Sequence, residues 1–312
     1  MQKQISIVCP MRNEALLIDD LCMALEVLTR EICQRGYNVE VIFMDNASSD
    51  NTRELIENFV NLNQTETNYR YIRNTRDIGL QASLMTSMEI ANGDAFIVLH
   101  SDLEDPPQLI IDFIKSWEKG NKAVVGVMET RSDPRLYQWS SKLFYRILKI
   151  ASDQKVVADF TDFFLIDRSI YEDIALRPRT NQYIRGIISA NYGIDERISY
   201  QRLRRKAGKS NFNFAKRYEV ALDAIFALGT KLPRFFTIFS TASFFVSLFA
   251  YTSLPFGSAF GVQVNYAILL VVNLITLTLV GVAVGLEILF RIYNFLLNSN
   301  KKYSYEEFKG KD

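Results

Sequence analysis

The sequence predicts an α/β domain with a mostly parallel sheet, followed by an amphipathic segment and a hairpin of two membrane-spanning helices. Three observations support this prediction. Short apolar runs alternate with helical periodicity along about the first 130 residues, a pattern typical of a sheet with helices on both faces. Nine basic residues follow between 201 and 234. The next 52 residues, 235–286, contain no Asp, Glu, Lys or Arg.

The expected strands are short apolar runs at 5–8, 39–44, 69–72, 96–99 and 123–127. Apolar residues at helical spacing predict helices over 17–32, 55–59 and 109–117. Parallel strands joined in this way end at one edge of the sheet, where such domains bind their ligands. Polar clusters follow four of the strands, at 12–14, 45–50, 76–77 and 100–105. Neither GxGxxG nor GxxxxGK[ST] occurs, so the usual support for a dinucleotide fold or a P-loop ATPase is missing.

The composition argues against a disordered chain, a nucleic-acid-binding protein and a zinc site. Of 312 residues, 48% are hydrophobic, which excludes a disordered chain. The 36 Lys and Arg residues nearly balance 35 Asp and Glu residues, so whole-chain charge gives no reason to expect a nucleic-acid partner. Cys9, Cys22 and Cys33 match no zinc spacing and are expected to be reduced thiols of the core. The first apolar stretch is broken at Pro10 and does not suit a signal peptide, so the domain is expected in the cytoplasm.

The cluster at 100–105 is rich in acidic residues. In an extended segment Asp102 and Glu104 lie on the same side, and two carboxylates suit Mg²⁺ or Mn²⁺ with water and substrate phosphates as further ligands. Asp105 is expected to be the N-cap of a helix opened by two prolines. His100, the one histidine, is either a bonded residue at the strand end or a metal or phosphate contact. The alternative for the whole cluster is a structural role.

The uncharged tract is long enough for two helices, each needing about 20 apolar residues to cross a bilayer. We expect spans at about 233–253 and 264–290, joined by turn-forming residues. Basic residues flank the tract and are missing from its inner loop, which places the domain and the tail, 298–312, in the cytoplasm. Residues 211–232 are expected to form an amphipathic helix at the membrane surface. The alternatives are a buried helical pair and a core-facing helix of a soluble protein.

The polar motifs, in their order, resemble glycosyltransferase family 2, and more closely its polyisoprenyl-phosphate hexose synthases. This group includes dolichol-phosphate mannose synthases and bactoprenyl-phosphate glucosyltransferases. The resemblance covers almost the whole chain and implies a Rossmann-like GT-A domain over residues 1–210. The matched motifs are Pro10, Asn13-Glu14, 45–50, 102–107, 159–164, 202–210 and the two-span tail.

The resemblance also implies a role for individual residues. The nucleotide-sugar site would be lined by Pro10, Asn13, Glu14, Asp45 and Asp102. Mg²⁺ or Mn²⁺ would be held by Asp102 and Glu104, and the catalytic residues would be Asp102 and Asp159. The acceptor phosphate would be bound by Arg202, Arg205 and Ser210. The chain departs from the family where His100 and Glu104 replace an aspartate and a glutamine, and where Asn46 replaces the second residue of an aspartate pair.

The implied reaction is the inverting transfer of a hexose onto a membrane polyisoprenyl phosphate, such as undecaprenyl or dolichyl phosphate. UDP-glucose is the expected donor and GDP-mannose the alternative. The protein would be a two-span protein of the bacterial inner membrane, with a homo-oligomer left open. A processive polysaccharide synthase is a second alternative, because residues 182–186 match Gln-x-x-Arg-Trp except at Gly186. An inactive membrane scaffold is a third, suggested by His100 and Asn46.

Overall fold

The computed structural model describes residues 2–63, 67–128, 160–177, 183–203 and 304–309, together with scattered residues between 271 and 296. The expected surface helix, 211–232, and the first expected span, 233–253, lie outside these residues, as does part of the second span. Within the described part of the chain, no helix has both the length and the apolar composition needed to cross a bilayer.

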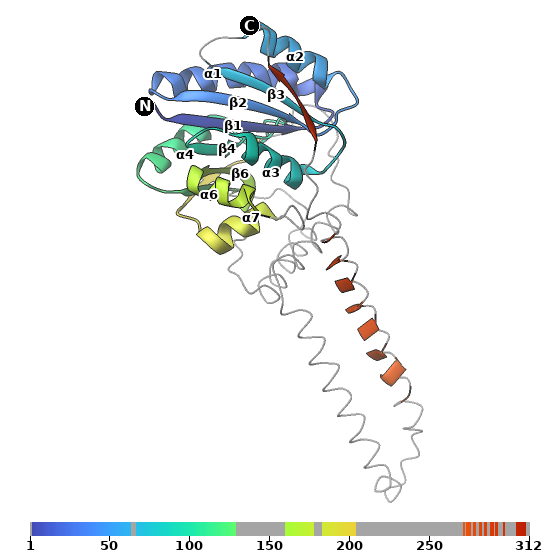
Figure 1. The fold of residues 1–312 in the computed structure, drawn as a ribbon. Coiled ribbons are helices and arrows are strands. Elements are labelled where there is room, and N and C mark those ends of the chain that lie inside the picture. Colours follow the sequence, from blue (N-terminus) through green and yellow to red (C-terminus); the bar gives the residue numbers. More distant parts are fainter. Residues whose placement is uncertain are drawn as a thin grey trace, which may run out of the picture.

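The strands form one eight-stranded sheet in the order β7-β5-β6-β4-β1-β2-β3-β8 (Figure 1). They are β1 (Gln4–Met11), β2 (Asn38–Asp45), β3 (Asn68–Asn74), β4 (Ala95–Val98), β5 (Ala123–Met128), β6 (Phe160–Asp167), β7 (Glu196–Tyr200) and β8 (Tyr305–Lys309). Six strands run in one direction, whereas β6 and β8 are antiparallel to their neighbours. The expected α/β class with a mostly parallel sheet is therefore confirmed.

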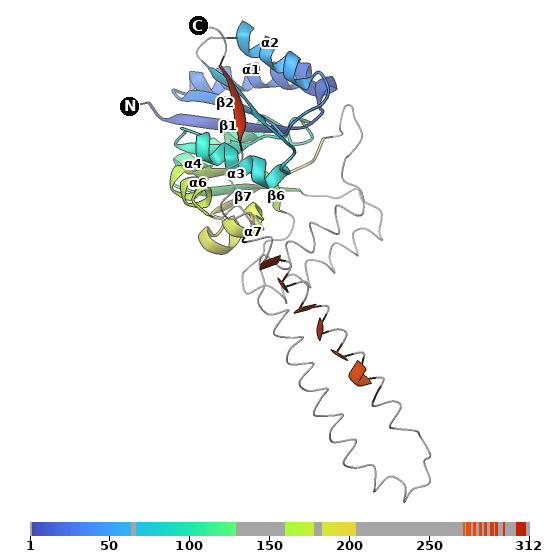
Figure 2. The same ribbon diagram turned by 45° about the vertical axis from the view of Figure 1, so that its right-hand side comes forward.

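Helices cover both faces of this sheet (Figures 1 and 2). One apolar cluster packs α1 (Ile18–Gln34), α2 (Thr52–Leu62) and α4 (Leu109–Glu118) on one face. A second cluster packs α3 (Leu80–Ile90), α6 (Arg168–Ala175) and α7 (Ile184–Ile187) on the other. Short helical turns, η1 (Ala15–Leu17) and η2 (Ile188–Tyr192), precede α1 and follow α7. Because both faces are covered, the central strands β1 and β2 are buried along almost their whole length.

The parallel strands define a carboxyl edge, where β1 to β4 end, and an opposite amino edge. Register places the start of β6 at the carboxyl edge, because Phe160 pairs with Val127 near the end of β5. β7 ends there too, since Tyr200 pairs with Met128. β8 begins there, because Tyr305 pairs with Asn74. The loops expected to carry the site therefore lie along this one edge.

Candidate functional site

The loops after β1 and β2 interlock at the carboxyl edge. The backbone N–H of Asn13 donates to Ser48 Oγ (2.9 Å), and the N–H of Ser49 donates to Asn13 Oδ1 (2.8 Å). Next along the chain, the N–H of Glu14 donates to Thr52 Oγ1 (3.1 Å). Asn13 has a φ of 55°, a left-handed conformation that asparagine tolerates better than most residues. Two motifs of the expected nucleotide-sugar site thus form one structure.

Asp45, the last residue of β2, is fully buried and holds the loop that follows it in place. Its Oδ1 accepts hydrogen bonds from the Ser48 hydroxyl (2.5 Å) and N–H (2.9 Å), and its Oδ2 accepts one from the Tyr71 hydroxyl (2.7 Å). Burial, together with the hydrogen bond to Asp45 and its charge, raises the pKa of Tyr71, so the phenol stays protonated as the donor. In this structure the Asp45 carboxylate therefore shapes the loop that carries Ser48.

Asn46 shows why an amide suits this position. Its Nδ2 donates to Asp77 Oδ1 (2.5 Å), while its Oδ1 accepts from the N–H of Ile78 (2.9 Å). Asp77 also pairs with Arg12, which comes from the loop after β1. A carboxylate in place of the amide would oppose Asp77 instead of donating to it. Compared with an aspartate pair, Asn46 removes one negative charge here. Asp77, from the loop after β3, supplies a negative charge beside it.

The acidic segment after β4 differs from the expected extended conformation. Leu103 has a φ of 50°, and its N–H donates to the carbonyl of His100 (3.3 Å), so the chain turns here. The N–H of Glu104 donates to Asp102 Oδ1 (3.2 Å). The prediction of an extended segment from Asp102 to Glu104 is therefore wrong. The tight turn, rather than the strand pleat, sets the relation of the two carboxylates.

Glu104 is joined to the segment that follows β7. Arg202 Nε lies 2.9 Å from Glu104 Oε2 and 3.7 Å from Asp105 Oδ1. The N–H of Leu203 donates to the carbonyl oxygen of Glu104 (2.8 Å). One candidate metal ligand and one candidate phosphate-binding residue, separated by 98 positions in the chain, are thus in contact.

Asp105 is not the N-cap that the sequence suggested. Helix α4 begins at Leu109 and its N-cap is Gln108. Asp105 is 1% exposed and its Oδ1 accepts a hydrogen bond from the Tyr200 hydroxyl (2.5 Å). Burial and the neighbouring Asp105 raise the pKa of Tyr200, which keeps the phenol protonated. Asp105 therefore fastens the end of β7 to the acidic turn.

The acidic turn offers a partial ligand set for a cation. Among the described residues, no three His, Cys, Asp or Glu side chains converge in a metal-binding arrangement. Asp102 and Glu104 supply two carboxylates, which are hard oxygen donors. Mg²⁺ is commonly held by one or two carboxylates, with water and substrate phosphates completing its shell. These two residues therefore fit a cation that is bound together with a substrate diphosphate.

Three candidate residues, Asp159, Arg205 and Ser210, lie outside the described part of the chain. The structure also shows an ion pair near this edge that the sequence did not predict. Arg185 Nε lies 3.2 Å from Asp162 Oδ1, near the carboxyl edge, and Arg185 NH1 donates to the carbonyl of Phe160 (2.8 Å). Two sequence motifs each contain one residue of this pair. Asp162 belongs to the 159–164 motif, and Arg185 belongs to the partial Gln-x-x-Arg match at 182–186.

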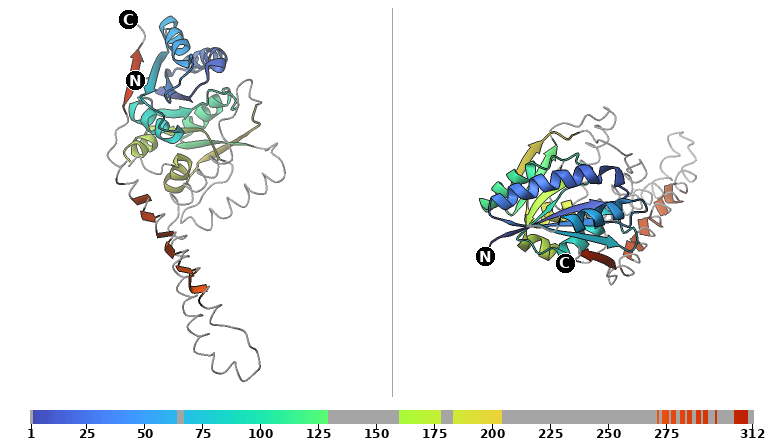
Figure 3. Two further views of the ribbon diagram at one scale, coloured as in Figure 1. Left: turned by 90° about the vertical axis from the view of Figure 1, so that its right-hand side faces the viewer. Right: turned by 90° about the horizontal axis from the view of Figure 1, so that it is seen from above.

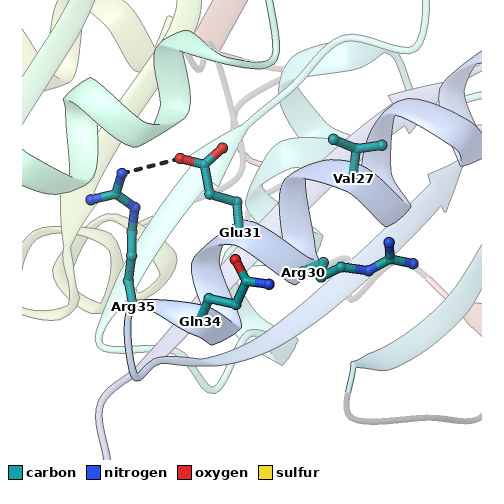
Figure 4. Close-up of a pocket in the computed structure, with 5 residues that line it drawn as sticks. All are labelled: Val27, Arg30, Glu31, Gln34 and Arg35. Carbon is teal, nitrogen blue, oxygen red and sulfur yellow. Dashed lines mark hydrogen bonds and ion pairs between the residues drawn. The ribbon is translucent and has the colours of Figure 1, made fainter.

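Two described cavities lie away from this edge. One, of about 500 Å³, is lined by Val27, Arg30, Glu31, Gln34 and Arg35 near the end of α1 (Figure 4). The other, of about 420 Å³, is lined in part by Lys3, Trp117 and Asp167. The end of α1 and the start of β1 both belong to the amino edge. Neither cavity therefore belongs to the candidate site.

Comparison with known proteins identifies the family. The model of glycosyl transferase family 2 matches residues 6–175. A prophage bactoprenol glucosyl transferase homolog of Escherichia coli (strain K12) is 30% identical over 236 residues, 75% of each chain. The bactoprenol glucosyl transferase of Shigella phage SfV is 30% identical over 229 residues, 73% of this chain and 72% of its own.

Two solved structures match the chain at low sequence identity and with TM-scores below 0.5. A mannosyltransferase from Pyrobaculum calidifontis, in complex with GDP-Man and Mn²⁺, matches 90% of this chain and 88% of its own at 14% identity, with a TM-score of 0.47. A glucosyl-3-phosphoglycerate synthase from Mycobacterium tuberculosis, in complex with UDP, matches 72% of this chain and 79% of its own at 14% identity, with a TM-score of 0.49. By its match to the family model over more than half of its residues, the chain is an enzyme that belongs to glycosyltransferase family 2.

Proposed function

We propose that this enzyme transfers a hexose, glucose from UDP-glucose, onto a membrane polyisoprenyl phosphate with inversion at the anomeric carbon. The observation that carries the proposal is the meeting of three features at the carboxyl edge. These are the interlocked loops around Asn13 and Ser48, the acidic turn at Asp102, and Arg202 beside that turn. The relatives named as bactoprenol glucosyl transferases support the choice of sugar and acceptor.

The division of roles follows from charge. Pro10, Asn13, Glu14 and Asp45 belong to the loops that would receive the nucleotide, and Asp102 with Glu104 would hold Mg²⁺ or Mn²⁺. When bound, such a cation stabilises the negative charge that develops on a leaving nucleoside diphosphate. Arg202, Arg205 and Ser210 would bind the acceptor phosphate, because guanidinium groups bind phosphate oxygens in a bidentate manner.

The acceptor needs little activation. A phosphate monoester has a second pKa of about 6 and is mostly a dianion at neutral pH. One of its oxygens can form the new bond to the anomeric carbon as the bond to the diphosphate breaks, and no proton has to be removed first. An acid near the reacting centre, Asp159 or the described Asp162, would then orient the substrates.

A membrane location is also part of the proposal. Among the described helical residues between 271 and 296, seven large apolar side chains are at least 44% exposed: Val271, Leu274, Ile275, Val282, Leu289, Ile292 and Leu296. Apolar surface of this extent is typical of a membrane or protein contact. With the uncharged tract, it favours a two-span anchor. The basic residues that flank the tract favour a cytoplasmic position for the enzyme domain and for the tail, 298–312.

The test is a transfer assay with the full chain in membranes. Labelled UDP-glucose and undecaprenyl phosphate are supplied with Mg²⁺ or Mn²⁺, and GDP-mannose is offered in parallel. A lipid carrying one glucose is the expected product. Mannosyl lipid would correct the donor, a polymer would indicate a processive synthase, and no transfer from either donor would contradict the proposed reaction.

A further inference from the structure

The two outermost strands of the sheet flank the chain segment 204–303. β7, which ends just before this segment, lies at one end of the strand order, and β8, which begins just after it, lies at the other. β7 ends at the carboxyl edge, where Tyr200 pairs with Met128. β8 starts at the carboxyl edge, where Tyr305 pairs with Asn74. The segment therefore leaves and re-enters the domain at the edge that carries the candidate site.

Both attachment points are fastened by specific contacts. On the β7 side, Arg202 pairs with Glu104 and the Leu203 N–H donates to the carbonyl of the same residue. On the β8 side, the Thr75 N–H donates to the Ser304 carbonyl (3.2 Å). Five residue pairs then join β8 to β3, and Phe308 packs against the main apolar cluster. Figure 3 shows β8 lying along the outer side of the sheet.

A ladder of hydrogen bonds between polar side chains stabilises β8 in this position. The Ser6 hydroxyl donates to Glu40 Oε1 (2.5 Å), Arg70 NH1 donates to Glu40 Oε2 (3.1 Å), and Arg70 Nε donates to Glu307 Oε1 (2.8 Å). Glu40 is fully buried and Arg70 is 8% exposed. The ladder crosses four strands, β1, β2, β3 and β8, and ends on the C-terminal strand. Without Glu307, the buried guanidinium would keep only one of its two carboxylate partners.

From this arrangement we infer that the sheet is held against the membrane at two points, so that its carboxyl edge faces the lipid surface. The inference rests on the membrane anchor of the proposed function. Adjacent strands lie about 4.8 Å apart, which separates the two outer strands by roughly 34 Å along the edge. Two attachments this far apart restrict tilting of the domain about its anchor, whereas a single attachment would leave that rotation free. The site is thereby kept facing a lipid-borne phosphate.

Fluorescence quenching in nanodiscs tests this orientation. In a Cys33→Ser background, single probes are placed at Gln201→Cys beside β7, at Arg76→Cys beside β3, and at Gln34→Cys on the amino edge. The nanodiscs contain phosphatidylcholine with a nitroxide on its headgroup. We expect strong quenching at positions 76 and 201 and little at position 34. Quenching at position 34 equal to that at the other two would overturn the inference.

Removal of the second attachment completes the test. A chain ending at residue 303 lacks β8 and should lose most of the quenching at position 76 but keep it at position 201. Glu307→Lys places a positive charge against Arg70 and should also reduce the quenching at position 76. Glu306→Lys is the control: Glu306 lies 3.6 Å from the exposed Arg53, and its substitution should change the quenching little. Unchanged quenching at position 76 without β8 would overturn the inference.

The quenching result is separate from the proposed reaction. A chain that enters nanodiscs with the expected quenching pattern but transfers no sugar contradicts the reaction alone. A chain recovered entirely outside the discs contradicts both the membrane anchor and the orientation. Hydrogen exchange of β4, which is central in the sheet, checks that the domain of each variant remains folded.

Discussion

Arg202 and Glu104 form an ion pair across the acidic turn, with 2.9 Å between Nε and Oε2. The pair joins two residues expected to serve different substrates, one the cation and diphosphate, the other the acceptor phosphate. Because the Arg202 side chain is 40% exposed, the pair is partly screened by solvent and can exchange partners at modest cost. Binding of a cation at this turn should therefore compete with Arg202 for Glu104.

This competition predicts opposite effects of two substitutions on Mn²⁺ affinity. Arg202→Gln frees Glu104 and should tighten Mn²⁺ binding by up to about fivefold, the equivalent of the ~1 kcal/mol typical of a partly exposed ion pair. Glu104→Gln removes a ligand and should weaken it. Titration of Mn²⁺ into the nucleotide-free protein, followed by electron paramagnetic resonance, measures both. Two changes of the same sign would show that Arg202 does not compete with the cation.

Asp102→Ala should abolish most of the transfer activity. Loss of the carboxylate removes charge stabilisation of the leaving diphosphate, for which we expect a decrease in kcat of roughly 100-fold. Asp112→Ala is the matched control, because Asp112 is exposed on α4 and pairs with Lys115, three residues further along the same helix (2.8 Å). Transfer rates in membranes compare the two. Activity of the Asp102 variant equal to that of the control would remove Asp102 from the site.

Asn46→Asp should destabilise the fold most at neutral pH. The new carboxylate would face Asp77 in a largely buried place, so its folded-state pKa should lie above the value of about 3.9 in the unfolded chain. A carboxyl group whose pKa is raised in the folded state lowers the free energy of unfolding at pH values above its unfolded-state pKa. This loss of stability disappears as the pH falls below the unfolded-state pKa. We expect a loss of about 1–3 kcal/mol at pH 7.

Thermal unfolding at pH 7 and pH 4 measures this effect. Asn51→Asp serves as the control, because Asn51 is exposed at the N-cap of α2, where a negative charge is favourable. A deficit that does not shrink at low pH would mean that repulsion from Asp77 is not its cause.

The pair formed by Asp162 and Arg185 should behave as one unit. Asp162→Asn and Arg185→Gln are each expected to cost about 1–3 kcal/mol, below the range for a fully buried pair because both side chains keep some exposure. The double variant should cost less than the sum, since the second change removes a charge that the first left unpaired. Chemical unfolding of the four proteins gives the coupling energy; strict additivity would show that the pair contributes no coupling.

The cysteines should differ in reactivity. Burial raises the pKa of the Cys22 thiol to about 12 and also raises the pKa of Cys9, so neither forms the reactive thiolate at ordinary pH. Cys33 is partly exposed. Iodoacetamide at pH 8 followed by mass spectrometry should therefore modify Cys33 first and the other two only after unfolding. Rapid modification of Cys9 in the folded protein would contradict its burial in the core.

The first five strands could be predicted from the sequence because each contains a short stretch of β-branched, aromatic or other apolar residues that is buried in the sheet. Helix α3 was missed, because Ser83, Thr86 and Ser87 are buried within it and satisfy their hydroxyls on carbonyls four residues earlier. This polar composition hides the apolar periodicity. Strand β8 was missed because Glu306 and Glu307 make it look like a solvated tail, whereas Arg70 and Arg53 provide partners for both charges.

The motifs located the carboxyl edge but not the contacts along it. Of the three cysteines expected in the core, Cys9 and Cys22 are buried and Cys33 is partly exposed. The loops at 13–14 and 48–52 meet as the parallel topology requires. The pairing of Glu104 with Arg202, and of Asp105 with Tyr200, depends on how the chain after β7 crosses the acidic turn. Local sequence patterns contain no information on such distant pairs.

The position of β8 has a consequence for biosynthesis. Arg70 and Glu307 are 237 residues apart, so the outer side of β3 stays unpaired until residues 305–309 leave the ribosome. At translation rates of about 5–20 residues per second, this interval lasts roughly 10–50 s. During that time β3 is an open sheet edge, which invites pairing with other chains. Completion of the sheet therefore follows synthesis of the entire segment 204–303, and the nascent domain depends on protection of this edge while that segment is made.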